Sequence, residues 1–273
     1  SMSASVIDRT DVLLVGAGPY ALSLAAELKH HGVDFTVVGR PLAFWKERMP
    51  AGMMLRSGTD WHLDPLAAHT FEAYVRQAGL PPESLSPVPL GVFLDYAAWF
   101  QARKGIEIDP RMVRRLDAVD GGFRAALDDG TTLAARRAVV AVGFEYGAHV
   151  TGGLARLLSD GLWGYTCQVV DFSPFQGKRC LIVGGRQSAL EWAALIHEAG
   201  AAGVHLVHRH ETPRLAASDW SWVPALVRRT VEAPGWYARL PAAEKHALAR
   251  RFWEEGPLKL EPSLGHRITH PSI

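Results

Sequence analysis

The chain has 273 residues, of which 48% are hydrophobic and 21% are charged, and its net charge is +1. This composition excludes a disordered chain and implies no general attraction to nucleic acid or anionic membranes. No apolar run approaches the roughly 18 residues of a membrane span, and the N-terminus lacks the basic start and apolar core of a signal peptide. The two cysteines, Cys167 and Cys180, form no C-x-x-C pair, so we expect a reducing, cytoplasmic compartment.

The stretch Asp11–Ala21 predicts a nucleotide-binding turn. Its apolar run indicates a strand buried on both faces, and Gly16, Gly18 and Ala21 then form a G-x-G-x-x-A spacing at the start of a helix. A second strand follows over residues 35–38, which completes the strand–turn–helix–strand unit in which this fingerprint is specific. Gly16 permits the tight turn, Gly18 lets a pyrophosphate approach the backbone, and the helix N-terminus favours its negative charge.

The second strand ends at Gly39-Arg40, where a dinucleotide site usually has an acidic residue for a ribose hydroxyl. Two interpretations of Arg40 stay open: it pairs with a phosphate or stacks on adenine, or it is a solvated surface residue. The following loop, residues 41–65, starts as a helical turn and is rich in Met, Gly and Trp. Such loops line flat cofactors, and an ordinary packed loop is the alternative.

Helices are expected over residues 70–79 and 89–100, with the aromatic residues of the second helix in the core. A short strand at residues 106–108 precedes a hairpin with an Asp-Gly turn at residues 123–133. A further buried strand is expected at residues 138–142. It ends at Gly143, which either lets the backbone approach a cofactor or merely ends the strand.

Residues 179–191 then repeat the opening unit. Gly184 and Ala189 occupy the places of Gly16 and Ala21 at the same offset, and a helix over 187–199 and a strand over 204–207 follow. The repeat indicates two dinucleotide-binding units in one chain.

The second unit departs from the fingerprint at Arg186, which replaces the middle glycine. Its side chain turns outward, or contacts a phosphate that sits higher, or the site has degenerated; the neighbouring Gly185 relieves part of the crowding. Arg209 ends the second strand, where an arginine suits the 2′-phosphate of NADP, and an unspecialised surface arginine is the alternative. Two amphipathic helices are expected at about residues 222–232 and 241–255.

With Phe44-Trp45 after the first unit and Gly-Gly-x-Gln-Ser-Ala-Leu-Glu in the second, the sequence resembles the FAD- and NADPH-dependent flavin monooxygenases. This group includes flavin-containing monooxygenases, Baeyer–Villiger enzymes and lysine/ornithine N-hydroxylases. The resemblance runs from about Asp11 to Arg209. We therefore expect an α/β fold with two Rossmann-like units, a small antiparallel β-meander and a helical C-terminal segment. An FAD-binding domain is expected at residues 9–165 and an NAD(P)H-binding domain at residues 176–273.

The resemblance also implies which residues hold the cofactors, whereas no catalytic residue, metal cluster or carboxylate pair is evident from the sequence. The FAD residues would be Gly16, Gly18, Pro19, Tyr20, Trp45, Arg56, Asp60 and Gly143, and the position of Arg40 after the second strand makes it a further candidate. The NADPH residues would be Gly184, Gln187, Ser188 and Arg209, and the position of Gly185 and Arg186 in the second turn makes them further candidates.

By the same resemblance, NADPH would reduce FAD, and a peroxyflavin would oxygenate a small-molecule amine, sulfide or ketone, because the cofactor carries the chemistry. The alternatives are a flavin reductase or oxidase without oxygenation and a non-catalytic dinucleotide-binding protein. Family members continue beyond the NADP domain and complete the FAD domain with a late glycine–aspartate strand. This sequence ends at Ile273, so we expect an FAD domain that is incomplete without such a segment and holds flavin weakly.

Overall fold

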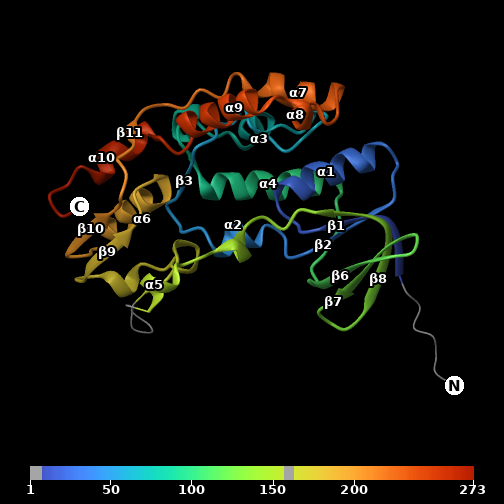
Figure 1. The fold of residues 1–273 in the computed structure, drawn as a ribbon, viewed down its shortest axis with the longest axis horizontal. Coiled ribbons are helices and arrows are strands. Elements are labelled where there is room, and N and C mark those ends of the chain that lie inside the picture. The colour runs from blue at the N-terminus through green and yellow to red at the C-terminus, as the bar shows by residue number, and fades with distance from the viewer. Residues whose placement is uncertain (1–7, 157–162) are drawn as a thin grey trace. The chain divides into compact units, whose positions relative to one another are not determined.

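The computed structural model describes residues 8–156 and 163–273 (Figure 1). The chain divides into two compact units, Ser1–Val170 (unit 1) and Asp171–Ile273 (unit 2). This division falls between the two predicted domains. Each unit contains a glycine turn between a strand and a helix, so the predicted α/β class with two Rossmann-like units is confirmed.

Unit 1 is built on a six-stranded sheet with the order β5-β2-β1-β8-β7-β6. The strands are β1 (Asp8–Val15), β2 (Phe35–Val38), β5 (Ile108–Asp109), β6 (Val113–Val119), β7 (Gly122–Leu127) and β8 (Thr132–Val140). Strands β5, β2, β1 and β8 run parallel, whereas β6, β7 and β8 form the predicted antiparallel meander.

Strand β1 is buried on both faces, as its apolar run predicts. Val12 and Leu14 pack against α1 (Pro19–His30) and α4 (Leu90–Lys104), while Leu13 and Val15 pack against the meander. Figure 1 shows the two helices together on one side of the parallel strands and the meander on the other. Alternate residues of one strand therefore join two separate cores.

The prediction of a separate buried strand at residues 138–142 is wrong. The hairpin strand and this segment form one long strand, β8, which pairs with β7 through residues 132–135 and with β1 along its length. Its carboxyl-terminal half is open to solvent, with Val139 37% and Val140 62% exposed. The predicted strand at 106–108 is shifted to Ile108–Asp109, because Ile106 packs into the helical core instead.

The remaining elements of unit 1 are short. They are α2 (Ala43–Glu47), β3 (Met54–Leu55), α3 (Phe71–Ala78), η1 (Pro82–Leu85), β4 (Val88–Pro89), η2 (Glu145–Gly147), α5 (Gly152–Ala155) and η3 (Thr166–Gln168). The Thr70 hydroxyl caps α3 by accepting from the Ala73 N–H at 3.1 Å. Phe93, Tyr96 and Phe100 on α4 are buried, so the prediction that its aromatic residues form core is confirmed.

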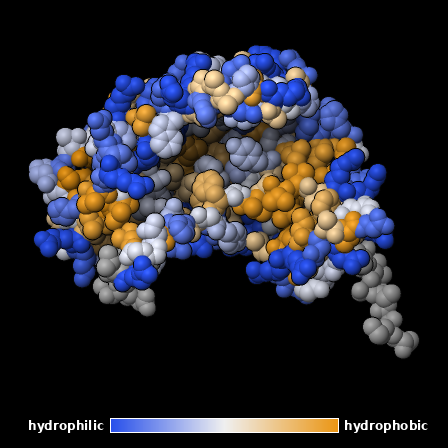
Figure 2. Space-filling model, viewed as in Figure 1, coloured by the Kyte–Doolittle hydropathy of each residue, from blue (hydrophilic) through white to orange (hydrophobic). Residues whose placement is uncertain are grey.

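Unit 2 contains a parallel pair, β9 (Arg179–Val183) and β10 (Gly203–Val207), with α6 (Gln187–Glu198) packed on one face. The other elements are η4 (Ser173–Phe175), β11 (Arg214–Leu215), α7 (Val223–Glu232), α8 (Trp236–Arg239), α9 (Ala242–Glu255), β12 (Lys259–Leu260), η5 (Pro262–Leu264) and α10 (Gly265–Ile268). The two predicted amphipathic helices are α7 and α9. The second face of the pair is open, because Leu181 and Val183 are 64% and 59% exposed; Figure 2 shows apolar surface over these strands.

None of the described helices combines the length and the hydropathy that crossing a bilayer requires.

Candidate functional site

The turn after β1 requires glycine at position 16. Gly16 has φ +112°, and a Cβ there would lie 2.3 Å from the Ala141 carbonyl oxygen. Its N–H donates to the Val38 carbonyl at 2.8 Å. The turn is thus enclosed between the ends of β2 and β8, and any side chain would force the strands apart.

Gly18 has a different surrounding, although it lies only two residues further on. It is the N-cap of α1 with an extended backbone (φ −88°, ψ −170°), and no atom lies within 4 Å of the Cβ it lacks. Pro19 begins the helix and Tyr20 is 87% exposed. This open space at a helix N-terminus fits a phosphate group, because the first-turn amides face it and a side chain would fill it.

Arg40 is held by a partner that the sequence interpretation did not include. Its Nη1 donates to both carboxylate oxygens of Glu47, at 2.8 and 2.9 Å, on a half-exposed surface. The preceding Gly39 has φ +149°, and its missing Cβ would lie 3.1 Å from the Ala17 amide nitrogen. Arg40 is therefore neither a lone cation nor an unpaired solvated residue.

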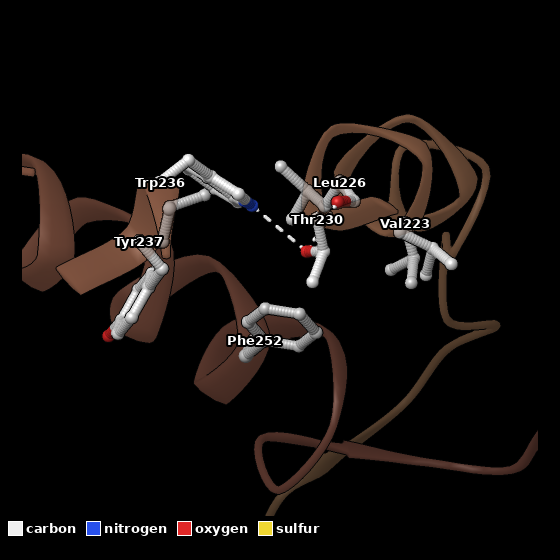
Figure 3. Close-up of a pocket in the computed structure, with 8 residues that line it drawn as sticks. Val223, Leu226, Thr230, Trp236, Tyr237 and Phe252 are labelled. Carbon is white, nitrogen blue, oxygen red and sulfur yellow. Dashed lines mark hydrogen bonds between the residues drawn. The ribbon is translucent and has the colours of Figure 1, made fainter. Parts of the chain in front are cut away.

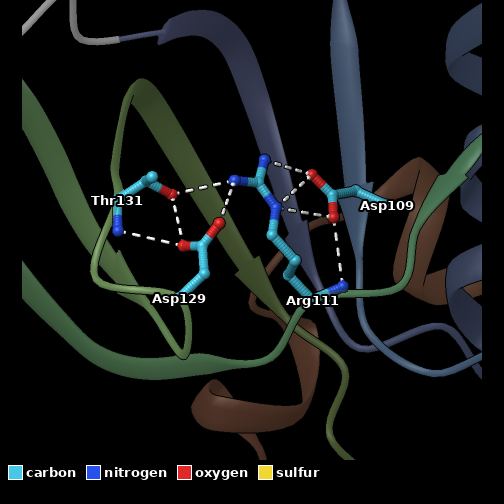
Figure 4. A network of polar contacts seen from close by, with 4 residues as sticks. All are labelled: Asp109, Arg111, Asp129 and Thr131. Atoms are coloured by element: carbon cyan, nitrogen blue, oxygen red, sulfur yellow. Dashed lines mark hydrogen bonds and ion pairs between the residues drawn. The ribbon is translucent and has the colours of Figure 1, made fainter.

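A polar network lies at the end of the edge strand β5 (Figure 4). Arg111 donates to Asp109 at the end of β5 and to Asp129 and Thr131 in the β7–β8 turn, at 2.6–3.1 Å. Hydrogen bonds from Thr131, and then from Arg111, lower the pKa of Asp129 to about 2. The Arg111 guanidinium also lowers the pKa of Asp109. The network ties the short edge strand β5 to the meander.

The loop at residues 41–65 is a packed loop in large part. The Trp45 ring lies 4.7 Å from the Phe93 ring of α4, and Arg48 donates to Glu145 at 2.9 Å. Arg56 is half-buried and Asp60 is exposed. Gly143, which follows the end of β8, has φ +65° and open space around its missing Cβ.

Sequence reasoning missed a buried carboxylate, Asp64, which anchors the end of this loop. Its Oδ2 accepts from Lys104 Nζ of α4 at 2.8 Å and from the His69 N–H at 2.7 Å. Burial alone would raise the pKa of Asp64, but the hydrogen bonds from Lys104, His69 and Leu66 outweigh burial, and the pKa lies below its ordinary value. The sequence Asp64-Pro65 is typical of an ordinary turn, so only the tertiary packing identifies the ion pair between Asp64 and Lys104.

The turn after β9 repeats the geometry of the first turn. Gly184 has φ +143°, and Arg186 is the N-cap of α6 with φ −109° and ψ −172°, close to the values of Gly18. A Cβ at Gly185 would lie 2.3 Å from the His208 ring, so this glycine lets the end of β10 pack on the turn. The backbone of the dinucleotide turn is thus preserved although its middle glycine is absent.

The Arg186 side chain turns outward, which is the first of the three sequence-based alternatives. Its Nη1 donates to the Pro257 carbonyl at 2.8 Å, and its guanidinium lies over the Trp253 ring. Gln187 accepts from the Glu261 N–H at 3.1 Å. The segment from Trp253 of α9 to Glu261 therefore binds two side chains of the turn, whereas Ser188 is exposed.

Arg209 is exposed at the end of β10 and forms no hydrogen bond or ion pair with the described residues. The rings of His208 and His210 stack beside it with centroids 4.7 Å apart, and His208 Nδ1 donates to the His210 carbonyl at 2.7 Å. The guanidinium is thus available to an anion.

Comparison with known proteins places the chain among pyridine-nucleotide-linked flavoproteins. The profile of the pyridine nucleotide-disulphide oxidoreductase family matches residues 10–222. The chain is 27% identical over 177 residues to an FAD-dependent urate hydroxylase of Xanthomonas campestris pv. campestris, covering 63% of this chain and 36% of that protein. It is 30% identical over 189 residues to the indole-3-pyruvate monooxygenase YUCCA1 of Oryza sativa subsp. japonica, covering 66% and 43% of the two chains.

The fold is also similar to that of solved flavoenzymes. The ornithine hydroxylase of Pseudomonas aeruginosa superposes with a TM-score of 0.72 at 17% identity, over 95% of this chain and 68% of that one. The chain spans less than half the length of the two curated relatives.

Proposed function

The chain belongs to the pyridine nucleotide-disulphide oxidoreductase family, and from this premise we propose that it is a flavin-dependent monooxygenase. In this proposal it uses NADPH and FAD to oxygenate a small-molecule amine, sulfide or ketone in the cytoplasm. The two curated relatives named above are an FAD-dependent hydroxylase and a monooxygenase, which supports this direction.

The observation that carries the proposal is the open space over Gly18 at the N-terminus of α1. Gly16 is enclosed and cannot carry a side chain, whereas the missing Cβ of Gly18 faces no atom within 4 Å. Packing within unit 1 therefore explains why position 16 is glycine. In this proposal, a bound ligand explains why position 18 is glycine. A dinucleotide pyrophosphate is the group that this arrangement favours.

The two units have separate roles in the proposal. Unit 1 holds FAD through the turn at Gly16–Tyr20, with Arg40, Trp45, Arg56, Asp60 and Gly143 around it. Unit 2 holds NADPH through Gly184, Gly185, Gln187 and Ser188, and Arg209 binds its 2′-phosphate. When bound, FAD supplies the redox and oxygen chemistry; the protein binds and orients both cofactors and excludes water.

The cysteines argue against disulfide reduction, the activity in the family's name. A flavin disulfide reductase of this shape needs a close dithiol pair beside the flavin. Cys167 and Cys180 are 13 positions apart in the sequence, which is not the C-x-x-C spacing, and both are free cysteines. Oxygenation requires no such pair.

The test is the absorption spectrum of the purified protein after loading with FAD. Under nitrogen, NADPH should bleach the flavin band, and oxygen should then restore it with formation of oxygenated product from a supplied amine, sulfide or ketone. Stoichiometric hydrogen peroxide without product would support the reductase or oxidase alternative. Protein that binds no flavin would support the non-catalytic alternative.

A further inference from the structure

Three helices of unit 2 surround a groove of about 220 Å³. It lies between α7, α8 and α9, and Figure 3 shows side chains from all three pointing into it. The lining consists of Val223, Leu226, Val227, Thr230, Trp236, Tyr237, Leu248 and Phe252. Four of these residues recur at helical spacing along α7, so one apolar stripe of that helix forms a complete wall.

The wall of the groove carries two hydroxyls, on Thr230 and Tyr237. The Thr230 hydroxyl donates to the Leu226 carbonyl at 2.9 Å and accepts from Trp236 Nε1 at 2.9 Å, whereas Tyr237 is exposed at the rim. The space between Leu226, Trp236 and Phe252 therefore favours an apolar group, because a polar group there would lose its hydrogen bonds to water.

The rim of the groove exposes apolar side chains. Val227, Tyr237 and Phe252 are 57%, 49% and 42% exposed although they line it. Exposed apolar surface that is contiguous with a concave site is typical of binding surfaces.

Two cations lie on aromatic rings of the same groove. The Arg229 guanidinium lies 4.5 Å from the centroid of the Trp236 ring, and Lys245 Nζ lies 5.8 Å from that of Tyr237. Among the described residues, neither cation forms an ion pair with a carboxylate. The groove thus combines a mainly apolar wall with two cations that form no ion pair among the described residues, and Lys245 Nζ also donates to the Ala238 carbonyl at 2.8 Å.

We propose that this groove binds a small monocarboxylate with an apolar body, such as an aryl-substituted or short-chain fatty acid. The apolar body fills the space between Leu226, Trp236 and Phe252, and the carboxylate pairs with Arg229 or Lys245 at the rim. The volume is below the roughly 300–1,000 Å³ of sites for drug-sized ligands, so the ligand is small. The inference concerns unit 2 alone and does not depend on the proposed function.

The experiment measures binding of three probes of similar length to the full chain by titration calorimetry: 4-phenylbutyrate, 4-phenylbutan-1-ol and 4-phenylbutylamine. We expect the carboxylate to bind about fivefold more tightly than the alcohol, since a charge pair at a half-exposed rim contributes modestly. The amine should bind most weakly, because the rim cations repel it.

Variants locate the site. Val227→Trp fills the groove from an exposed position and should abolish binding of the carboxylate and the alcohol. Arg229→Gln and Lys245→Gln together should reduce the carboxylate to the affinity of the alcohol and leave the alcohol unchanged. Arg250→Gln, an exposed residue of α9 outside the groove, is the matched control and should change neither affinity.

Three results would overturn the proposal. The first is equal affinity for the carboxylate, the alcohol and the amine, which removes the role of the cations. The second is unchanged binding in a Val227→Trp variant that melts like the wild type. The third is failure of all three probes to bind; if Val227→Trp then converts a dimer to a monomer in sedimentation, the groove is an interface between copies of the chain.

Discussion

The Arg186 guanidinium lies 4.5 Å from the centroid of the Trp253 ring, and its Nη1 donates to the Pro257 carbonyl at 2.8 Å. Arg186 occupies the position in unit 2 that Gly18 occupies in unit 1, with a similar backbone conformation. The charged side chain thus ties the second turn to the end of α9, instead of standing free over the helix N-terminus.

Arg186→Ala should therefore destabilise unit 2. The lost stacking contributes about 0.5–1 kcal/mol and the lost charge-assisted hydrogen bond about 1.5–3 kcal/mol, so the free energy of unfolding should decrease by about 2–4 kcal/mol. Denaturant titration followed by circular dichroism measures it, with Arg250→Ala as a control expected within about 0.5 kcal/mol of wild type. Wild-type stability of Arg186→Ala would mean that the side chain does not hold this position in solution.

Gly16 and Gly18 should separate folding from cofactor binding. Gly16→Ala places a Cβ 2.3 Å from the Ala141 oxygen at a φ of +112°, and we expect a loss of about 1–3 kcal/mol in stability. Gly18→Val points into open space and should fold normally but remain colourless after FAD loading. Thermal melts and flavin absorbance test both variants; a stable Gly18→Val protein with its full complement of FAD would place the flavin elsewhere.

Arg209 should determine the choice between NADPH and NADH. The side chain is exposed and unpaired with the described residues, so Arg209→Ala should leave the fold intact. A charge-assisted contact to the 2′-phosphate contributes about 1.5–3 kcal/mol, so NADPH affinity should fall about ten- to a hundredfold with NADH nearly unchanged. Calorimetric titrations at low salt measure both affinities, and wild-type protein that binds the two equally well would refute the assignment.

Lys104 should be among the most sensitive positions of unit 1. Lys104→Met leaves the Asp64 carboxylate buried without its cation, and removal of one partner of a buried pair costs about 3–5 kcal/mol. The double variant Lys104→Met, Asp64→Asn removes the uncompensated charge and should recover part of this loss. Urea unfolding distinguishes the outcomes; equal stability of the single variant and wild type would show that the pair contributes nothing.

The Arg111 network should make unit 1 sensitive to acid. The pKa of Asp129 falls from 3.8 to about 2 on folding, mainly through Thr131, and that of Asp109 also falls. A carboxyl with a depressed folded pKa stabilises the protein above its unfolded pKa, and this stabilisation is lost as the pH falls through the folded value. Melting temperature should therefore drop between about pH 4 and pH 2, and less steeply in Arg111→Met. Parallel pH profiles of the two proteins would contradict the network's role.

Local pattern was sufficient for the elements that position both turns. The strand predicted over residues 35–38 is β2, and the helices predicted after both turns are α1 and α6, because apolar periodicity and glycine turns are properties of neighbouring residues. The antiparallel meander was predicted from its hairpin with an Asp-Gly turn. The apolar run at 138–142 was misjudged, because composition cannot tell whether another layer covers a strand.

The sequence by itself determined that this chain has two strand–turn–helix units and where the glycines and arginines of each turn lie. Only the tertiary structure decided that Arg40 binds Glu47, that Asp64 is buried against Lys104, and that Arg186 turns toward a residue 71 positions away in the chain. The direction of a long charged side chain depends on which aromatic ring or oxygen atom lies within its reach after the chain has packed. No local sequence pattern identifies the ring or oxygen that such a side chain contacts, because only folding brings distant segments together.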